Sequence, residues 1–407
     1  MDVLFLAPAY PTEMRRFTRG FAEVGARVWG VGDTPAGALP EEVRSCLSGY
    51  LHVPRIMDEA DVIQRVEAWL GDRRPDRIES LWEPLVLLAA RLRDRLGVPG
   101  MSHDTVLGFR DKQLMKERVA AAGLRVPHSR RVRKASEIWE AAEQIGYPLI
   151  LKPIAGAGSA DTYRVDDARQ LASVLERMGH VKEASCEEFV DGEEFTYDTV
   201  CINGRPAYEN VAQYLPRPLI ARTNEWISPV IITVRDMQQP KIRAGVELGR
   251  NVLKALGMGT GFTHMEWYRK SNGEVVFGEI GCRPGGAHLV DQMNFTSDIS
   301  LYRECARAIC WGAFDADATR RFNTAIVFKR AMGKGRIRAV TGLEGWKQRC
   351  GRWVAAEELL PVGANRRDWL QTLVSDGFVI VRHPDWDTAH DMAFDAATHI
   401  QMYATPD

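Results

Sequence analysis

Short apolar runs alternate with amphipathic stretches along the first 105 residues. The apolar runs predict buried strands at Val3–Ala7, Arg27–Val31 and Ile78–Trp82, and helical spacing predicts helices at Met14–Val24, Ile56–Trp69 and Pro84–Leu96. Gly97 follows the last helix, where a C-terminal glycine is common. Strands that alternate with helices predict an α/β unit with a parallel sheet.

The rest of the chain mixes both periods, which predicts an α+β organisation. Strands are expected at Pro148–Pro153, Thr162–Val165, Glu187–Val190, Phe195–Cys201, 325–329 and 378–381, and helices at 104–123, Asp166–Met178, Asp236–Leu256, 293–313 and Asp385–Tyr403. We therefore expect three domains: an N-terminal α/β domain over 1–105, a lid region over 106–190 and a C-terminal domain over 191–407, whose last part, from about 322, forms a small α/β cap.

Composition narrows the class of protein. The chain has 407 residues, of which 45% are hydrophobic and 26% charged, as in ordinary globular proteins. The 53 Lys and Arg residues balance 54 Asp and Glu residues, so no overall field favours nucleic acid or a membrane as partner. Seven cysteines without a CxxC pair suggest reduced thiols and a cytoplasmic protein, and we interpret the start, MDVLFLAPAYP, as a strand rather than a signal peptide.

The segment 261–286, GFTHMEWYRKSNGEVVFGEIGCRPGG, predicts a β-hairpin around Asn272-Gly273. If that dipeptide forms a two-residue loop, Glu266 lies directly opposite Glu279, with Cβ atoms roughly 5 Å apart. Two such carboxylates repel, and a bound Mg²⁺ would supply the counter-charge. A pair of solvated carboxylates on an edge hairpin is the alternative, and a three-residue loop would break the register.

Two further motifs precede this hairpin. Lys152 stands in an apolar strand, where an ammonium needs an anion, and the small residues 155–159 that follow could close backbone N–H groups over a phosphate. In CEEFVDGEEFTYD, a strand end at Glu187–Val190 could bind an adenine edge, and the next turn delivers a carboxylate suited to ribose hydroxyls. A flexible hairpin with a snorkelling lysine and a solvated acidic hairpin are the respective alternatives.

The order of these motifs resembles that of the ATP-grasp superfamily over about residues 80–310. The resemblance begins at FRDKQLMKERVAAAGLRVP and continues through YPLILKPIAGAGS and EEFVDGEEFT to THMEW…FGEIGCRPGG. It implies a three-domain ATP-grasp architecture and a ligase of the carboxylate–amine type, which activates an acid as an acyl phosphate and releases ADP and phosphate.

The resemblance also implies site residues. Lys112 and Lys152 would hold the ATP phosphates, and the flap over them would contain Gly156, Gly158 and Ser159. Adenine would contact Glu187, Glu188 and Val190, and ribose would contact Glu194. Glu266 and Glu279 would bind Mg²⁺ (or Mn²⁺), and Arg283 would steady the transferring phosphoryl group. The family pattern is commonly E-x-N-x-R, with the Asn binding a second metal ion, whereas Gly281 fills that slot here. The hairpin register places His264 opposite Gly281. His264 could therefore partly fill the gap left by the missing Asn or meet the substrate, and a packed core histidine is the alternative.

The substrate side is less defined by the sequence. The resemblance to L-amino-acid ligases and biotin-carboxylase-like proteins implies amino-acid-like acid and amine substrates. Arg217 and Arg283 could fix a carboxylate, Glu83 and Glu225 could receive an α-ammonium, and His288 could act as a base. Alternatives are a carboxylase that uses bicarbonate through carboxyphosphate, and a nucleotide-binding regulator without turnover. A homodimer is expected by analogy with related ligases.

Overall fold

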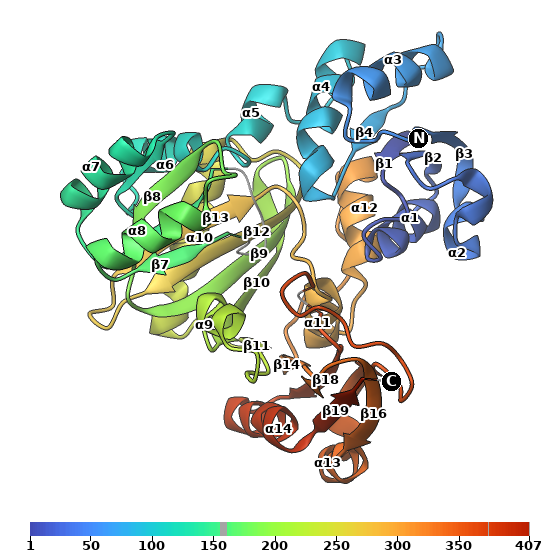
Figure 1. The fold of residues 1–407 in the computed structure, drawn as a ribbon. Helices are drawn as coiled ribbons and strands as arrows, with labels where there is room; N and C mark the ends of the chain where they lie inside the picture. The colour runs from blue at the N-terminus through green and yellow to red at the C-terminus, as the bar shows by residue number, and fades with distance from the viewer. Residues whose placement is uncertain (155–160, 373, 407) are drawn as a thin grey trace.

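The computed structural model describes residues 1–154, 161–372 and 374–406. An N-terminal α/β part (blue), a lid (teal and green) and a C-terminal part (red) surround a large central sheet (Figure 1). Within the described residues, no helix combines the length and the apolar character needed to span a bilayer.

Four parallel strands form the N-terminal sheet. Their order is β3 (Leu47–His52), β2 (Arg27–Gly32), β1 (Asp2–Leu6) and β4 (Arg77–Glu79), and the helical segments around them are α1 (Met14–Glu23), η1 (Ala36–Ala38), α2 (Glu41–Arg44), α3 (Glu59–Leu70), η2 (Glu83–Leu85) and α4 (Val86–Leu96). The predicted parallel sheet is confirmed. The sequence did not predict β3, because this edge strand is only partly buried and lacks an apolar run.

The lid is a second, antiparallel sheet that carries Lys152. Its order is β5 (Ser129–Val132), β8 (Ala184–Glu188), β6 (Leu149–Pro153) and β7 (Tyr163–Val165), covered by α7 (Ala135–Ile145) and α8 (Ala168–Arg177). Leu149 and Leu151 point into the lid core, so the alternate residues Ile150 and Lys152 face the opposite side. The strands expected at 148–153 and 162–165 are confirmed.

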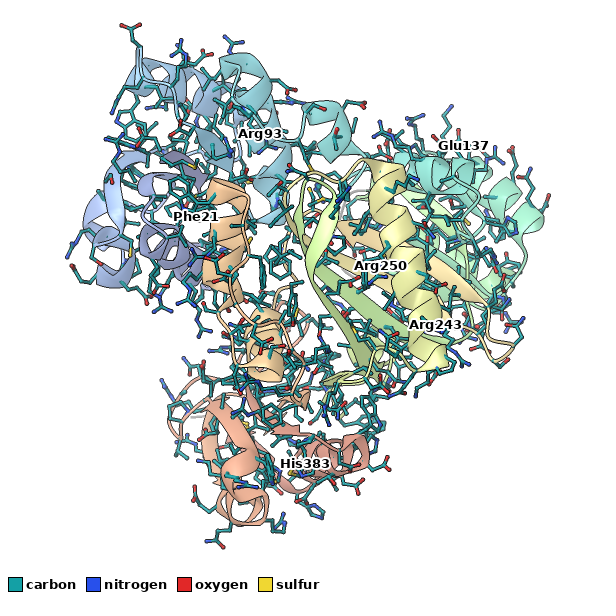
Figure 2. The ribbon with its side chains drawn as sticks, turned by 180° about the vertical axis from the view of Figure 1, so that it is seen from behind. Phe21, Arg93, Glu137, Arg243, Arg250 and His383 are labelled. Atoms are coloured by element: carbon teal, nitrogen blue, oxygen red, sulfur yellow. The ribbon has the colours of Figure 1, made fainter. Side chains whose placement is uncertain are left out.

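The central sheet has eight antiparallel strands. Their order is β13 (Val275–Gly281), β12 (Gly261–Arg269), β9 (Glu193–Ile202), β10 (Arg205–Leu215), β11 (Val230–Thr233), β14 (Asn323–Phe328), β18 (Gly377–His383) and β17 (Val354–Leu359). Helix α10 (Pro240–Leu256) packs on one face, with Arg243 and Arg250 on its outer side (Figure 2), while α11 (Leu289–Ser297) and α12 (Leu301–Trp311) pack on the other.

The approach of α10 to the central sheet depends on glycine. A Cβ on Gly245 would lie 2.1 Å from the Trp267 ring, and one on Gly249 would lie 2.2 Å from the Tyr197 ring. Both aromatic rings are fully buried. The two glycines, one turn apart on the helix, therefore let the backbone of α10 rest directly on aromatic side chains of β9 and β12.

The C-terminal part continues the central sheet through β14, β17 and β18 and adds a small sheet of its own. That sheet contains β15 (Met332–Gly333), β19 (Gln401–Thr405) and β16 (Arg336–Thr341), with α13 (Leu343–Cys350), η3 (Gly351–Trp353) and α14 (Trp386–His399) beside it. Residues beyond 322 thus share a sheet with the preceding region. The division at 105, 190 and 322 into domains stays a prediction.

Three predicted helices were too long. The expected helix 104–123 is two helices, α5 (His103–Leu107) and α6 (Lys112–Ala121), because the Asp111 side chain accepts the backbone N–H groups of Gln113 and Leu114 and starts a new helix. The expected helix 293–313 is divided between α11 and α12 at Asp298, which has φ of 57°. The expected helix from Asp385 ends at His399, before β19.

Candidate active site

The two-glutamate hairpin is formed by β12 and β13. Glu266 pairs with Glu279 across the strands, so the predicted register at this point is confirmed. The predicted two-residue loop was wrong: Lys270 N–H donates to the Glu274 carbonyl at 2.9 Å, which leaves a three-residue turn. A bulge at Gly278 compensates for the extra turn residue, since Trp267 pairs with Phe277 while Glu266 pairs with Glu279.

The two glutamates differ in electrostatic surroundings. Burial, followed by the neighbouring Glu279 charge, raises the pKa of the Glu266 carboxyl. Burial also opposes the charge on Glu279, but Lys112 and Lys152 lower its pKa well below the usual range. The Tyr214 hydroxyl donates to Glu266 at 3.4 Å. Lys152 and Arg283 act on Glu266 in the opposite direction, but burial and Glu279 have the larger effect on its pKa.

Three lysines converge on the hairpin. Lys112 Nζ lies 3.3 Å and Lys152 Nζ lies 3.6 Å from Glu279 Oε2, and Lys152 Nζ lies 3.2 Å from Glu187 Oε2. Glu187 also pairs with Lys116, which the sequence analysis missed. Its spacing of four residues from Lys112 on α6 was the available signal, because such residues share one helix face.

Burial sets the protonation of this lysine cluster. It lowers the pKa of Lys116 to about 8, although Glu187 opposes the shift. Lys152 is also desolvated, but Glu187 and Glu279 raise its pKa above the ordinary value. Glu187 is buried too, yet Lys116 and Lys152 lower its pKa to about 2. Lys152 therefore stays charged beside the cleft, which suits an anionic phosphate.

A cleft opens beside these lysines, lined by residues of the lid and of the central sheet. Its lining includes predicted phosphate, adenine, ribose and metal residues, namely Lys112, Lys152, Glu187, Glu188, Val190, Glu194, Glu266 and Glu279. The predicted flap residues Gly156, Gly158 and Ser159 lie outside the described residues. The structure thus brings the described members of the predicted nucleotide set together.

The end of the cleft next to the predicted adenine and ribose residues contains an arginine that we expected to bind the substrate. Arg217, just before α9 (Pro218–Thr223), lies 3.0 Å from Glu194 and donates to the Val190 carbonyl at 2.9 Å. Burial and the Glu266 charge raise the pKa of Glu194 to about 7, against the effect of Arg217. Glu188, also in the lining, forms an ion pair with Arg125 at 2.7 Å.

A second, smaller cavity adjoins the first and is also lined by Lys112, Glu266 and Glu279. Glu83 forms ion pairs there with both Arg283 and Arg110. Burial opposes the charge on Glu83, but Arg283 and Arg110 lower its pKa. Glu83, which we predicted to receive an α-ammonium group, thus already has two cationic partners. Its role toward the substrate stays a prediction.

His264 lies in the same cavity, on the carboxylate face as predicted. Its Nδ1 lies 2.5 Å from Asp198 Oδ1, and the other Asp198 oxygen accepts from Thr196 at 2.8 Å and Asn210 at 3.2 Å. This network fixes the imidazole ring. Cys282, which follows Gly281, is buried, and burial raises the pKa of its thiol to about 12.

Glu225 and His288 have other surroundings. Glu225 forms an ion pair with Arg366 at 2.6 Å. His288 Nδ1 lies 2.8 Å from Asp291, and its ring packs against Phe378 with centroids 4.3 Å apart. Both predicted substrate roles stay predictions.

The donor set suits Mg²⁺ with the nucleotide present. Across residues 1–154, 161–372 and 374–406, no group of three or more His, Cys, Asp or Glu side chains is arranged to hold a metal ion. Two carboxylates remain, Glu266 and Glu279, and both offer hard oxygens. Mg²⁺ is commonly held by one or two carboxylates while phosphate and water complete its shell, so these residues fit the ion.

Comparison with known proteins agrees with this geometry. The family model of the ATP-grasp domain matches residues 117–291. This region is therefore an ATP-grasp domain, and the chain is homologous to L-amino acid ligases. The L-arginine-specific L-amino acid ligase of Bacillus subtilis is 26% identical over 283 residues, which are 68% of each chain.

Two solved structures share the whole fold. The L-amino acid ligase from Bacillus licheniformis has a TM-score of 0.80 at 19% identity, over 99% of this chain and 98% of that one. The N5-carboxyaminoimidazole ribonucleotide synthetase from Thermotoga maritima has a TM-score of 0.71 at 17% identity, over 99% of both chains. At such identities the likeness shows a common ATP-grasp architecture.

Proposed function

We propose that this protein is a Mg²⁺- and ATP-dependent carboxylate–amine ligase that forms an amide or peptide bond. One observation carries the proposal: Lys112 and Lys152 form ion pairs with Glu279 of the Glu266–Glu279 pair, between a cleft and a second cavity with two arginines. A nucleotide in the cleft would thus have its terminal phosphate beside a place for an acid.

The chain's residues suit phosphoryl transfer. Lys112 and Lys152 hold phosphate oxygens, and Arg283 steadies the phosphoryl group on the side of the acid. Mg²⁺, or Mn²⁺ in its place, would be held by Glu266 and Glu279 and would neutralise the phosphate oxygens. Adenine lies against the strand end at Glu187–Val190, and ribose lies near Glu194.

The reaction proceeds in two transfers. A carboxylate oxygen of the acid attacks the γ-phosphorus, the bond to the β-phosphate oxygen breaks, and ADP leaves. The amine nitrogen then attacks the acyl carbon, phosphate leaves with the oxygen that it bonded to, and the amine loses a proton. Exclusion of water from the enclosed cavity protects the acyl phosphate from hydrolysis.

The substrates are proposed to be amino-acid-like. The similarity to an L-arginine-specific L-amino acid ligase supports this class, and the second cavity offers both arginine and carboxylate groups to a zwitterion. A cytoplasmic location and a homodimer stay predictions.

The test is ADP release from ATP over the twenty proteinogenic L-amino acids, with mass spectrometry of the products. Hydroxylamine replaces the amine and captures an acyl phosphate as a hydroxamate. We expect acid-dependent ADP release that Lys152→Ala and Glu279→Gln abolish, each with an unchanged far-UV circular dichroism spectrum. ADP release that depends on bicarbonate would favour the carboxylase, and ATP binding without any ADP release would favour a regulator.

A further inference from the structure

An ion-paired triad from three separate segments lies in the second cavity. Glu83 begins η2 in the N-terminal part, Arg110 lies between α5 and α6, and Arg283 follows β13. One Glu83 oxygen pairs with Arg110 Nη1 and the other with Arg283 Nε. The three side chains are between 14% and 18% exposed, so the triad is largely shielded from water but open to the cavity.

Gly281 makes room for this triad. A Cβ at position 281 would lie 3.2 Å from Glu83 Oε2 and 3.5 Å from Arg283 Nε. The backbone of Gly281 does not take a left-handed conformation, so the glycine is needed for space and not for φ. The Glu83 carboxylate therefore occupies the place toward which a side chain at 281 would point.

The triad carries one net positive charge, which can serve both the acid and the phosphoryl group that Arg283 steadies. Glu266 and Glu279 are assigned to Mg²⁺ and Lys112 to phosphate, which leaves two guanidinium groups against one carboxylate. These two ion pairs use one N–H group of each guanidinium, and Arg283 Nη1 also donates to the Pro284 carbonyl at 2.8 Å. Each guanidinium has five N–H donors, so donors remain for a single anionic group.

Stability alone does not explain such a triad. Taking three charges out of water is costly, and buried ion pairs often stabilise a fold no better than apolar residues of similar volume. A shielded Arg–Glu–Arg cluster that faces a cavity is better explained as a preorganised anion site. Bidentate recognition of a planar carboxylate is the interaction for which guanidinium groups are suited.

We propose that Arg110 acts with Arg283 to bind the reacting carboxylate of the acid substrate, and that Glu83 is the positioning residue that orients both guanidinium groups. The inference rests on the ligase function proposed above and adds Arg110, Glu83 and Gly281 to its substrate site. The cavity they line also contains both hairpin glutamates, so a carboxylate held by the arginines lies beside the phosphate site.

Steady-state kinetics of hydroxamate formation test the role of Arg110. The probes are ATP, hydroxylamine and whichever of the twenty proteinogenic L-amino acids gives activity with the wild-type enzyme. Arg110→Met is expected to raise the KM for the acid by about tenfold to a hundredfold, the usual effect of losing charged hydrogen bonds. Arg110→Lys is expected to recover part of this loss, and binding of a fluorescent ATP analogue is expected to stay within twofold.

Arg118→Met is the matched control, since Arg118 lies on α6, the helix that follows Arg110, pairs with Asp104 at 3.0 Å and is not part of the cavity lining. An unchanged acid KM in Arg110→Met overturns the inference. So does a rise in the KM of an amino-acid amine with the acid KM unchanged, or a loss of ATP binding. A wild-type enzyme that produces neither ADP nor hydroxamate with any acid overturns the ligase function as well.

A double-mutant cycle tests the positioning role of Glu83. Gly281→Ala is expected to raise the acid KM at least fivefold, because the new methyl group displaces the Glu83 carboxylate. In the Glu83→Ala background, the same Gly281→Ala change is expected to alter the acid KM less than twofold, since the carboxylate is no longer there to displace. Equal effects of Gly281→Ala in both backgrounds would refute the positioning role.

Discussion

Replacing Glu187 by Gln removes the carboxylate that neutralises two buried lysines. Glu187 on β8 is 4% exposed and lies between Lys116 and Lys152. Burial disfavours its charge, but the two lysines lower its pKa from 4.5 to about 2. A shift of this size corresponds to about 3 kcal/mol in favour of the charged, folded state.

We expect Glu187→Gln to lower the free energy of unfolding by about 3 kcal/mol at pH 7, in the range seen when one partner of a buried ion pair is removed. The stabilisation is fully present above pH 4.5 and is lost as the pH falls toward 2, because the unfolded chain then binds the proton more readily. Urea unfolding followed by circular dichroism measures the free energy of unfolding of the wild type and the variant at pH 7 and at pH 4.

The neighbouring residue supplies the control. Glu188 lies on the same strand, is partly exposed and pairs with Arg125 at 2.7 Å. An ion pair open to water contributes about 0.2–1 kcal/mol, so Glu188→Gln is expected to have a much smaller effect than Glu187→Gln. If the two variants lose the same stability, Glu187 does not neutralise the lysine cluster as the structure indicates.

Three further outcomes are expected. Gly245→Ala should destabilise the protein by about 1–3 kcal/mol in urea unfolding, because its methyl group would overlap the Trp267 ring. The control is Gly345→Ala on α13, which should be neutral or stabilising because the nearest atom is a flexible arginine end 3.3 Å away. A Gly245→Ala variant that is more stable than the wild type would contradict the packing. Burial lowers the pKa of Lys329 to about 8. Between pH 8 and 10.5, the free energy of unfolding of the wild type should therefore rise by up to about 3 kcal/mol more than that of Lys329→Met. Parallel pH profiles of the two proteins would refute this. Removal of divalent cations with EDTA should abolish ATP-dependent thermal stabilisation, and Mg²⁺ or Mn²⁺ should restore it; undiminished protection in EDTA would argue against the two-glutamate metal site.

Local signals in the sequence were enough for much of the fold. Period-two and period-3.6 patterns predicted the N-terminal parallel sheet, the strand with Lys152 and the long helix over α10, because those elements bury one continuous face. Prediction failed where a cap or a half-buried edge decides the outcome. Asp111 divides a helical pattern by accepting two backbone N–H groups, and β3 has no apolar run to reveal it.

The pairing of Glu266 with Glu279 was predicted for an incomplete reason. The hairpin pattern suggested a register, but the real turn has one more residue than expected. The bulge at Gly278 restores the register before the glutamates are reached. A turn and a bulge are each compatible with the local sequence, so only the packed sheet selects this combination.

The chain by itself determined which chemical groups are present and in what order. A strand with Lys152 comes first, the acidic segment around Glu187–Glu194 follows, and the hairpin with two glutamates and Arg283 comes last. The tertiary structure decided which charged groups lie close enough to form ion pairs. Lys116 meets Glu187, and Glu83 reaches Arg110 and Arg283 beside Gly281, across separations in sequence of 71, 27 and 200 residues. Electrostatic interactions depend on distance in space and on exclusion of water, and neither follows from sequence spacing once several elements pack together.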